Sequence, residues 1–330
     1  MEYKPQPDRY TNGMLYRRCG DSGIQLPVIS LGFWHNFGNT DCYATGLELV
    51  EYAFDHGVCH FDLANNYGPP AGSAEENFGR MMKQSFAAHR DEMFISSKAG
   101  HEMWEGPYGG NSSRKNLMAS IDQSLKRMGV DYVDLFYSHR YDGVTPIDET
   151  MQALVDIVHQ GKALYIGLSK YPIDKLIYAL NYLHEAHVPC LAYQARYNLL
   201  DRAVEEHHLS LCQKNGIGFV AFSPLAQGLL TGKYQQGIPS GSRIDRPEGH
   251  LQAESLRPDL LQKIARLQEI ARRRNQPLAQ MALAWLLHTD RVTSVIIGAR
   301  NLAQLKDNLA ATGNTRFSDE EINDIQQALQ

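Results

Sequence analysis

The sequence predicts an α/β protein folded as a (β/α)8 barrel, and three observations support this class. Eight short runs rich in β-branched and aromatic residues alternate with longer segments whose apolar residues have helical spacing. Six of these runs end in a residue that can react or hydrogen-bond, and barrel active sites lie at such strand ends. No Gly-x-Gly-x-x-Gly turn follows an early run, although the competing doubly wound sheet would normally carry one there.

The strands are expected at intervals along the whole chain. A small hairpin, Met14–Arg18 paired with Gly23–Pro27, precedes the barrel because Gly20-Asp21-Ser22-Gly23 is typical of a turn. The expected barrel strands are Val28–Leu31, Cys59–Asp62, Met93–Lys98, Tyr132–His139, Ala163–Ser169, Cys190–Gln194, Gly218–Ser223 and Thr293–Gly298.

The clearest helix between the strands is Ser113–Met128. Leu117, Ile121 and Leu125 lie on one face of it. Gly129 follows, and glycine commonly ends a helix because it tolerates a left-handed backbone.

Further helices are expected near the C-terminus. Pro277 opens one, because proline favours the first helical position. Leu302–Ala311 and Ser318–Leu329 follow the last strand, and Ser318 with Glu321 has the spacing of a capping box. We expect residues 1–330 to form a single barrel domain, with the hairpin, the segment 224–257 and the terminal helices added to a barrel of about 250 residues.

The composition excludes several functions. Lys plus Arg total 32 and Asp plus Glu total 37, so the formal net charge is -5 and nucleic acid is not an expected partner. No apolar run approaches the roughly 20 residues that cross a bilayer, and the N-terminus has no signal-peptide core. The five scattered cysteines are typical of free thiols in a reducing compartment, so a cytoplasmic location is expected. No set of histidines and cysteines has the pattern of a zinc site, so no metal is expected.

Four residues at the strand ends are candidates for catalysis. Asp62, Lys98 and His139 end three successive strands, and Tyr67 follows Asp62 on the next loop. A lysine cation beside a phenol should lower its pKa from about 10, and Asp62 could hold that lysine. A neutral His139 could donate a hydrogen bond to a carbonyl oxygen, so the set suits reduction of a carbonyl with Tyr67 as the acid. Each residue also has a structural reading, such as an Asp62–Lys98 ion pair, but the joint occurrence favours catalysis.

At these four residues the sequence resembles the aldo-keto reductase superfamily, and the resemblance extends from Tyr16 to about Ala311. Within the superfamily it is similar to the bacterial L-glyceraldehyde-3-phosphate reductase group and, more distantly, to the potassium-channel β subunits. The motifs that carry the resemblance are 31–38, 61–79, Lys98-Ala99-Gly100 and 221–234. The resemblance implies a (β/α)8 barrel, NADPH or NADP as cofactor without a Rossmann fold, and Tyr67 as general acid.

The same resemblance implies a set of cofactor-binding residues, which includes Asp62. They are Gly32, Phe33, Trp34, Ser169, Gln194, Phe222, Ser223, Pro224, Leu225, Ala226, Gly228, Lys233, Arg243, Gly298, Arg300, Gln304, Asp307 and Asn308. Phe222 matches an aromatic residue that stacks on the nicotinamide, and Lys233 and Arg243 match basic contacts to phosphate. Arg300 and Asp307 depart from the channel-subunit pattern, which has serine and glutamate there. Arg300 could pair with the 2′-phosphate of NADPH or point into solvent.

The expected function is NADPH-dependent reduction of small aldehydes, with L-glyceraldehyde 3-phosphate, methylglyoxal and aromatic aldehydes as candidates. Substrate contacts are expected from Trp34, His35, Tyr67, Trp104 and His139, with Tyr108 near the mouth. Arg140 and Arg114 could anchor a phosphate, but structural ion pairs are favoured for both.

The alternative function is a weakly catalytic NADP(H)-sensing subunit that binds a partner protein. The channel subunits carry asparagine at the position of His139, so the histidine here favours the enzyme. The resemblance to those subunits also makes a homo-oligomer an expectation.

Overall fold

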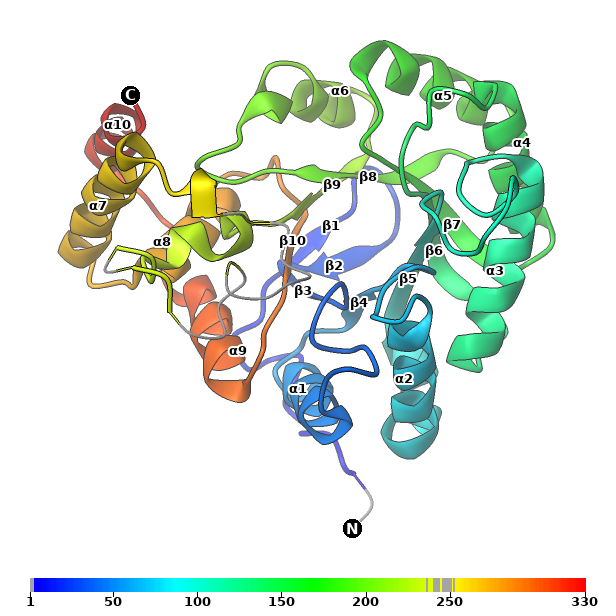
Figure 1. Ribbon diagram of the computed structural model, residues 1–330, viewed down its shortest axis with the longest axis horizontal. Helices are drawn as coiled ribbons and strands as arrows, with labels where there is room; N and C mark the ends of the chain where they lie inside the picture. Colours follow the sequence, from blue (N-terminus) through cyan, green and yellow to red (C-terminus); the bar gives the residue numbers. More distant parts are fainter. Residues whose placement is uncertain (1–2, 236, 240–243, 245–250, 252) are drawn as a thin grey trace.

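Eight parallel strands close into a barrel, which confirms the predicted fold class (Figure 1). The structure is a computed structural model that describes residues 3–235, 237–239, 244, 251 and 253–330. The strands follow one another around the barrel in chain order, and β10 pairs with both β9 and β3 to close it. The strands are β3 (Ile29–Gly32), β4 (His60–Asp62), β5 (Phe94–Ala99), β6 (Val133–Ser138), β7 (Ala163–Ser169), β8 (Cys190–Arg196), β9 (Gly218–Phe222) and β10 (Ser294–Ile297).

All eight predicted barrel strands are present, with ends that differ from the prediction by one or two residues. β7 matches its predicted range, and β8 continues to Arg196. His139 was expected to end a strand, but it lies one residue beyond β6. Its backbone N–H still donates to the carbonyl of Ala99 at 2.9 Å, so the residue stays fixed at the strand end.

The helices surround the barrel, as Figure 1 shows. They are α1 (Tyr43–Asp55), α2 (Ser73–Met81), α3 (Arg114–Met128), α4 (Ile147–His159), α5 (Ile173–Glu185), α6 (His208–Lys214), α7 (Pro258–Arg273), α8 (Leu278–Leu287), α9 (Leu302–Leu309) and α10 (Asp319–Ala328). Among the described residues, no helix is both long and apolar enough to cross a membrane.

Local sequence explains several helix ends. The Ser113 side chain accepts the N–H of Asn116 at the start of α3, and Gly129 ends that helix with a left-handed backbone (φ 65°), as predicted. The capping box of Ser318 and Glu321 at α10 is also confirmed. Pro277 caps α8 rather than opening its first turn, because its backbone is still extended (ψ 149°).

The N-terminal hairpin closes the amino end of the barrel. It consists of β1 (Tyr16–Arg18) and β2 (Gln25–Pro27), paired antiparallel as predicted but shorter. Cys19 and Leu26 of the hairpin pack in one buried cluster with barrel residues, including Val220. A Cβ at Gly218, the first residue of β9, would lie 2.2 Å from the Cys19 sulfur, so this contact requires glycine. Since the hairpin covers the amino end of the barrel, a ligand-binding site is expected at the carboxyl ends of the strands.

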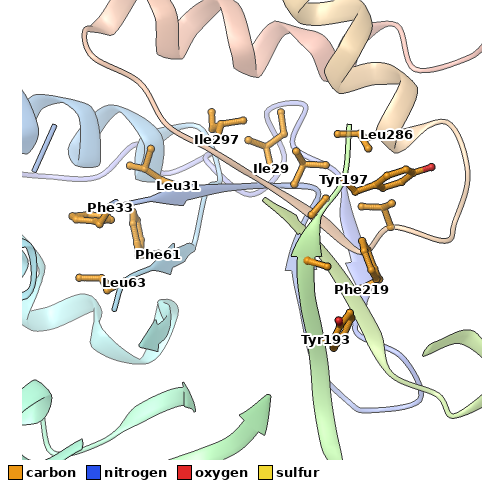
Figure 2. Close-up of a cluster of buried hydrophobic side chains, with 14 of the residues drawn as sticks. Ile29, Leu31, Phe33, Phe61, Leu63, Tyr193, Tyr197, Phe219, Leu286 and Ile297 are labelled. Carbon is orange, nitrogen blue, oxygen red and sulfur yellow. The ribbon is translucent and has the colours of Figure 1, made fainter. Parts of the chain in front are cut away.

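The larger core lies where the strands pack against the surrounding helices. Figure 2 shows part of it, with Phe61 of β4 and Phe219 of β9 among the labelled side chains. Burial of apolar side chains on this scale is the main stabilising contribution to such a fold, at roughly 25 cal/mol per Å² of apolar surface. All five cysteines are free, as the sequence predicted.

Candidate active site

A cavity of about 730 Å³ opens at the carboxyl ends of the barrel strands. Its size lies within the range of about 300–1,000 Å³ that is usual for small-molecule sites. Asp62 of β4, Gln194 of β8 and Phe222 of β9 line one part of it, and Gln304 and Asn308 of α9 line another. The cavity therefore lies on the face where barrel active sites are found.

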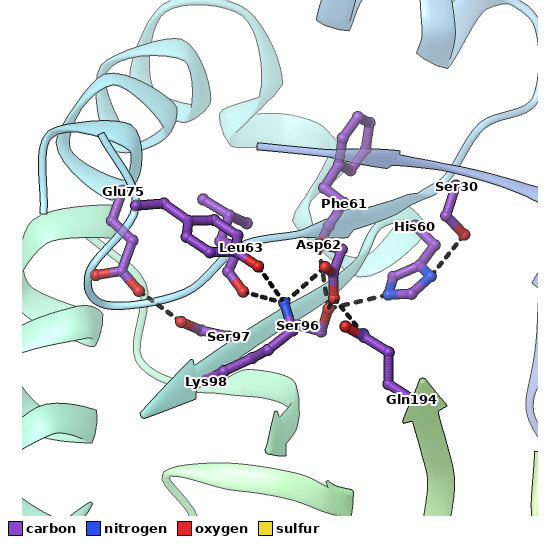
Figure 3. Close-up of polar contacts among 11 residues, drawn as sticks. Ser30, His60, Phe61, Asp62, Leu63, Glu75, Ser96, Ser97, Lys98 and Gln194 are labelled. Atoms are coloured by element: carbon purple, nitrogen blue, oxygen red, sulfur yellow. Dashed lines mark hydrogen bonds and ion pairs between the residues drawn. The ribbon is translucent and has the colours of Figure 1, made fainter. Parts of the chain in front are cut away.

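Asp62 and Tyr67 line this cavity, and both contact Lys98, which is fully buried behind them. Asp62 and Lys98 lie on adjacent strands, in which Asp62 pairs with Ser96, so that Lys98 points to the same side two residues later. The Lys98 ammonium donates to Asp62 Oδ2 at 2.6 Å and to the Leu63 carbonyl at 2.6 Å (Figure 3). It also donates to Tyr67 Oη at 3.5 Å. The lysine thus joins the carboxylate to the phenol.

Burial sets the protonation of this group. Burial first, and then the negative charge of Asp62, raise the pKa of Tyr67 well above its usual value of 10. The sequence-based expectation that Lys98 lowers the pKa of Tyr67 is therefore wrong for this structure. Burial also lowers the pKa of Lys98, although the charge of Asp62 opposes this effect. Tyr67 is a neutral phenol at neutral pH, which is the form that can donate a proton.

Asp62 also ends a buried series of hydrogen bonds, and Figure 3 shows its members Ser96, His60 and Ser30. The series runs through five distances between 2.6 and 3.0 Å, which join Asp62, Ser96, His60, Ser30, Ser294 and the carbonyl of Pro27. Burial lowers the pKa of His60 to about 4, so its imidazole is neutral and supplies one N–H. The three hydroxyls and this N–H give four protons for five contacts.

One of these five hydrogen-bond contacts therefore has no proton to fill it. The negative charge of Asp62 favours the arrangement in which Ser96 donates to it. His60 Nε2 must then donate to Ser96, and His60 Nδ1 must accept from Ser30. The unfilled contact falls at Ser294, at the end of the series farthest from Asp62. This series of hydrogen bonds thus assigns the proton of His60 to Nε2 and holds the Asp62 carboxylate in place.

His139 lies in the same cavity. Its side chain is buried, its ring packs edge-on against Tyr67 with 5.9 Å between centroids, and His101 packs against it at 4.4 Å. Burial first, and then the positive charge of Lys98, lower the pKa of His139 well below its usual value. The imidazole is therefore neutral, and its Nδ1 has no hydrogen-bond partner within the described part of the chain.

Gln194 and Ser169 differ in their position relative to the cavity. Gln194 lines it and donates to Asp62 Oδ1 at 3.0 Å. Ser169 is fully buried beside it and does not line the cavity, but its hydroxyl has no partner among the described residues. A buried polar atom without a partner indicates a position that a polar ligand group could satisfy.

Loop 223–233 provides a second part of the wall. Ser223, Gln227 and Gly228 have left-handed backbone (φ 53°, 58° and 98°), a geometry that turns backbone N–H groups toward anions. Lys233 lines the cavity beside this loop, and a Cβ at Gly228 would lie 2.9 Å from its ammonium. Pro224 and Leu225 also line the cavity, and Ala226 does not.

The far end of the cavity lies at the N-terminus of α9. Asn301 caps this helix by accepting the N–H of Gln304, and Gly298, Gln304, Asp307 and Asn308 line the cavity here. Helix N-termini favour phosphate groups. Asp307 accepts a hydrogen bond from Gln280 at 2.7 Å, and Arg300 lies outside the lining. The cavity is thus lined by the amide of Gln194, the aromatic ring of Phe222, the cation of Lys233 and the N-terminal turn of α9, a set of groups that could hold a nicotinamide dinucleotide.

Some predicted site residues lie elsewhere. The Phe33 side chain is fully buried and stacks on Phe37 at 4.0 Å between ring centroids, so Phe33 does not line the cavity, although its neighbours Gly32 and Trp34 do. Trp104 lies in a separate hollow lined by residues 102–107, 110 and 111, Tyr108 is exposed, and neither lines the main cavity. Trp34 and His35 do line it and pack on each other at 4.3 Å. Arg243 lies outside the described residues.

Of the two candidate phosphate anchors, Arg114 forms the structural ion pair that the sequence favoured, whereas Arg140 bonds to backbone carbonyls instead. Arg114 forms an ion pair with Asp156 on the helical surface. Arg140 donates to the carbonyls of Gly100 at 3.0 Å and Gly110 at 3.3 Å. Neither arginine lines the cavity.

Sequence reasoning missed three basic residues in the wall: His101, Lys170 and Arg196. Lys170 directly follows Ser169, and Arg196 follows Gln194 by two residues, so each lies next to a strand end that was singled out. His101 lies three residues after Lys98, so extending the search by three residues past each predicted strand end would have found all of them. No group of three or more metal-binding side chains occurs within the described ranges.

Comparison with known proteins gives two results. The sequence profile of the aldo/keto reductase family matches residues 28–330. L-glyceraldehyde 3-phosphate reductase of Escherichia coli strain K12 is 52% identical over 335 residues, which cover 100% of this chain and 96% of that protein, and the protein of strain O157:H7 matches equally. A probable voltage-gated potassium channel subunit beta of Arabidopsis thaliana is 37% identical, covering 90% of this chain and 91% of that subunit.

Proposed function

Because this chain belongs to the aldo/keto reductase family, we propose that it reduces small aldehydes with NADPH as the hydride donor. The observation that supports this most strongly is that Tyr67, Asp62 and His139 line one cavity while the buried Lys98 donates to both Tyr67 and Asp62. The bound cofactor would supply a hydride to the carbonyl carbon. The protein must then supply a proton to the carbonyl oxygen and hold that oxygen in place.

Tyr67 is the proposed proton donor. Its raised pKa keeps the phenol protonated before the reaction, and proton transfer leaves a buried phenolate. Lys98 lies 3.5 Å from that oxygen, so its ammonium would stabilise the new negative charge. Asp62 holds the ammonium in position by a hydrogen bond of 2.6 Å.

His139 is proposed to orient the substrate. As a neutral imidazole in the cavity wall, it can donate one hydrogen bond to the carbonyl oxygen without competing as an acid. Trp34 and His35, which line the same cavity, would contact the rest of the aldehyde.

The remaining lining residues would hold the cofactor. Gln194 and the unpartnered hydroxyl of Ser169 are suited to the carboxamide, and Phe222 to the face of the nicotinamide ring. Loop 223–228 and Lys233 would bind the pyrophosphate, and the α9 residues would bind the adenosine end. NADPH is preferred over NADH in this proposal because Arg300, whose backbone N–H donates to the lining residue Gln304 at 3.0 Å, lies at the adenosine end, where only NADPH carries a 2′-phosphate.

The candidate substrates include L-glyceraldehyde 3-phosphate, on which the Escherichia coli relatives act by name, and also methylglyoxal and aromatic aldehydes. A weakly catalytic NADP(H)-sensing subunit is the less favoured function, because all four residues of the proposed catalytic set are in place. That the chain forms one barrel domain over residues 1–330, and works as a cytoplasmic homo-oligomer, stays a prediction.

The test is an NADPH-oxidation assay with these aldehydes, using the wild type and Tyr67→Phe. We expect the variant to bind NADPH as the wild type does, since only a hydroxyl is removed. Its kcat should fall by about 10²- to 10⁴-fold, the usual contribution of a general acid. A variant that keeps most of the wild-type kcat would refute Tyr67 as the acid. If none of these aldehydes supports NADPH oxidation by the wild type, the proposed function is refuted.

A further inference from the structure

Two cations stand at neighbouring points on the cavity rim. Lys170 follows β7 and Arg196 ends β8, and in these adjacent strands Ser169 pairs with Gln194. The backbone N–H of Lys170 donates to the carbonyl of Gln194 at 3.3 Å. Both side chains line the cavity, and neither belongs to the catalytic group of Tyr67, Lys98 and Asp62.

The Lys170 ammonium lies close to the proposed carbonyl position. It is 3.0 Å from His101 Nε2 and 5.9 Å from the ring centroid of Phe222. His101 in turn packs against His139. Only one imidazole ring therefore separates the Lys170 ammonium from His139.

No carboxylate in the lining balances these cations. The lining acids among the described residues are Asp62, which Lys98 holds, and Asp307, which bonds to Gln280 at the other end. Arg196 forms an exposed ion pair with Asp201, which lies outside the lining, but the distance of 3.9 Å is too long for a hydrogen bond and such a pair is weak. Although Lys170 is an exposed residue, loss of water around its ammonium and then repulsion from Lys98, Arg140 and Arg196 lower its pKa to about 8. The local field is thus positive.

A separate observation also indicates a ligand at this end of the cavity. His139 is only 6% exposed and lines the cavity, yet its Nδ1 has no partner among the described residues. Buried polar nitrogens are normally hydrogen-bonded, so this position is suited to a polar ligand group.

We infer that Lys170 and Arg196 bind the anionic group, a phosphate or a carboxylate, of a short-chain aldehyde whose carbonyl lies between Tyr67 and His139. This inference rests on the proposed reductase function and assigns its substrate selectivity to two residues. The chain must be short, because one imidazole separates the Lys170 ammonium from His139. Arg196 can bind such a group with two parallel hydrogen bonds, and Lys170 acts as a point charge.

The test compares charged and neutral aldehydes within each enzyme. The pairs are glyceraldehyde 3-phosphate with glyceraldehyde, and succinic semialdehyde with butanal. The quantity measured is the ratio of kcat/KM for the charged aldehyde to that for its neutral partner. A ratio within one enzyme cancels any effect of a substitution on cofactor binding or on His139.

We expect the wild type to prefer the charged member of at least one pair. Lys170→Met and Arg196→Gln should each reduce that ratio by about 10- to 100-fold, because a hydrogen bond to a charged group typically accounts for this factor. The pair in which the ratio falls identifies the anionic group. Lys214→Met is the matched control, since Lys214 ends α6 before the amino end of β9, on the opposite side of the barrel. Its ratio should equal that of the wild type.

The outcomes separate this inference from the proposed function. A wild type that reduces neutral aldehydes at least as well as charged ones would overturn the anion site and leave the reductase in place. Lys170→Met with lower activity but an unchanged ratio would also overturn it, since the lysine would then act only on His101 and His139. If the wild type reduces none of the four aldehydes, the reductase function and the inference are overturned together.

Discussion

Replacing Lys98 with methionine should strongly destabilise the protein. The lysine is fully buried, and its ammonium donates to Asp62 and to the Leu63 carbonyl at 2.6 Å each. Methionine fills a similar volume but has no charge and no donor. The Asp62 carboxylate, which is only 2% exposed, would then keep its negative charge without a cation.

The size of the effect follows from this geometry. Removing one partner of a buried ion pair costs about 3–5 kcal/mol. Ser96 and Gln194 still donate to Asp62, at 2.8 and 3.0 Å, so we expect a loss near the lower value. The unfolding entropy of a 330-residue chain is about 0.7 kcal/mol per kelvin, so a loss near the lower value corresponds to a fall in Tm of about 4 °C.

Thermal unfolding of the purified variants is the assay. The double variant Asp62→Asn with Lys98→Met removes both charges and should recover most of the lost stability, since the cost comes from the unpaired carboxylate. Tyr67→Phe serves as the control, because its hydroxyl accepts only a long hydrogen bond of 3.5 Å from Lys98. An unchanged Tm in Lys98→Met, or a double variant as unstable as the single one, would refute the electrostatic argument.

Three further predictions concern catalysis, cofactor and pH. His139→Asn should lower kcat for aldehyde reduction by about 10²-fold or more, because the shorter side chain moves the preorganised donor away from the carbonyl oxygen, and a kcat close to wild type would exclude that role. Arg300→Ser should reduce the ratio of kcat/KM for NADPH over NADH, and an unchanged ratio would mean that Arg300 does not contact the 2′-phosphate. Burial lowers the pKa of His60 and of His101 to about 4, below the usual unfolded value of about 6.5. The unfolded chain therefore binds protons first as the pH falls, so stability is complete above about pH 6.5 and decreases towards pH 4. A Tm that stays constant from pH 7 to pH 5 would contradict this.

Much of the fold could be predicted because short-range sequence patterns determine its elements. Eight segments rich in β-branched and aromatic residues, with helix-like segments between them, correctly predicted the eight barrel strands. The capping box at Ser318 correctly predicted the start of α10. The strand ends were displaced by one or two residues, because pairing across the barrel decides where a ladder stops. His139 shows this: its position beyond β6 depends on the carbonyl of Ala99 on the neighbouring strand.

The direction of the Tyr67 pKa shift could not be predicted in the same way. The sequence places a lysine near the phenol, which alone would lower the pKa. Burial of the phenol and the nearby Asp62 charge have the larger effect and raise it. Burial depends on every element around the cavity, so no local pattern carries this information.

The sequence by itself determined that the chain is a barrel and which four residues meet at its carboxyl end, since strand order and side-chain alternation follow from periodicity. Only the tertiary structure decided what surrounds them. It placed Phe33 in the core and Trp104 outside the cavity, and it brought Lys170 and Arg196 to the rim. Loop geometry and long-range packing set these positions, through contacts between residues far apart in the chain, and such contacts have no signature in a local pattern.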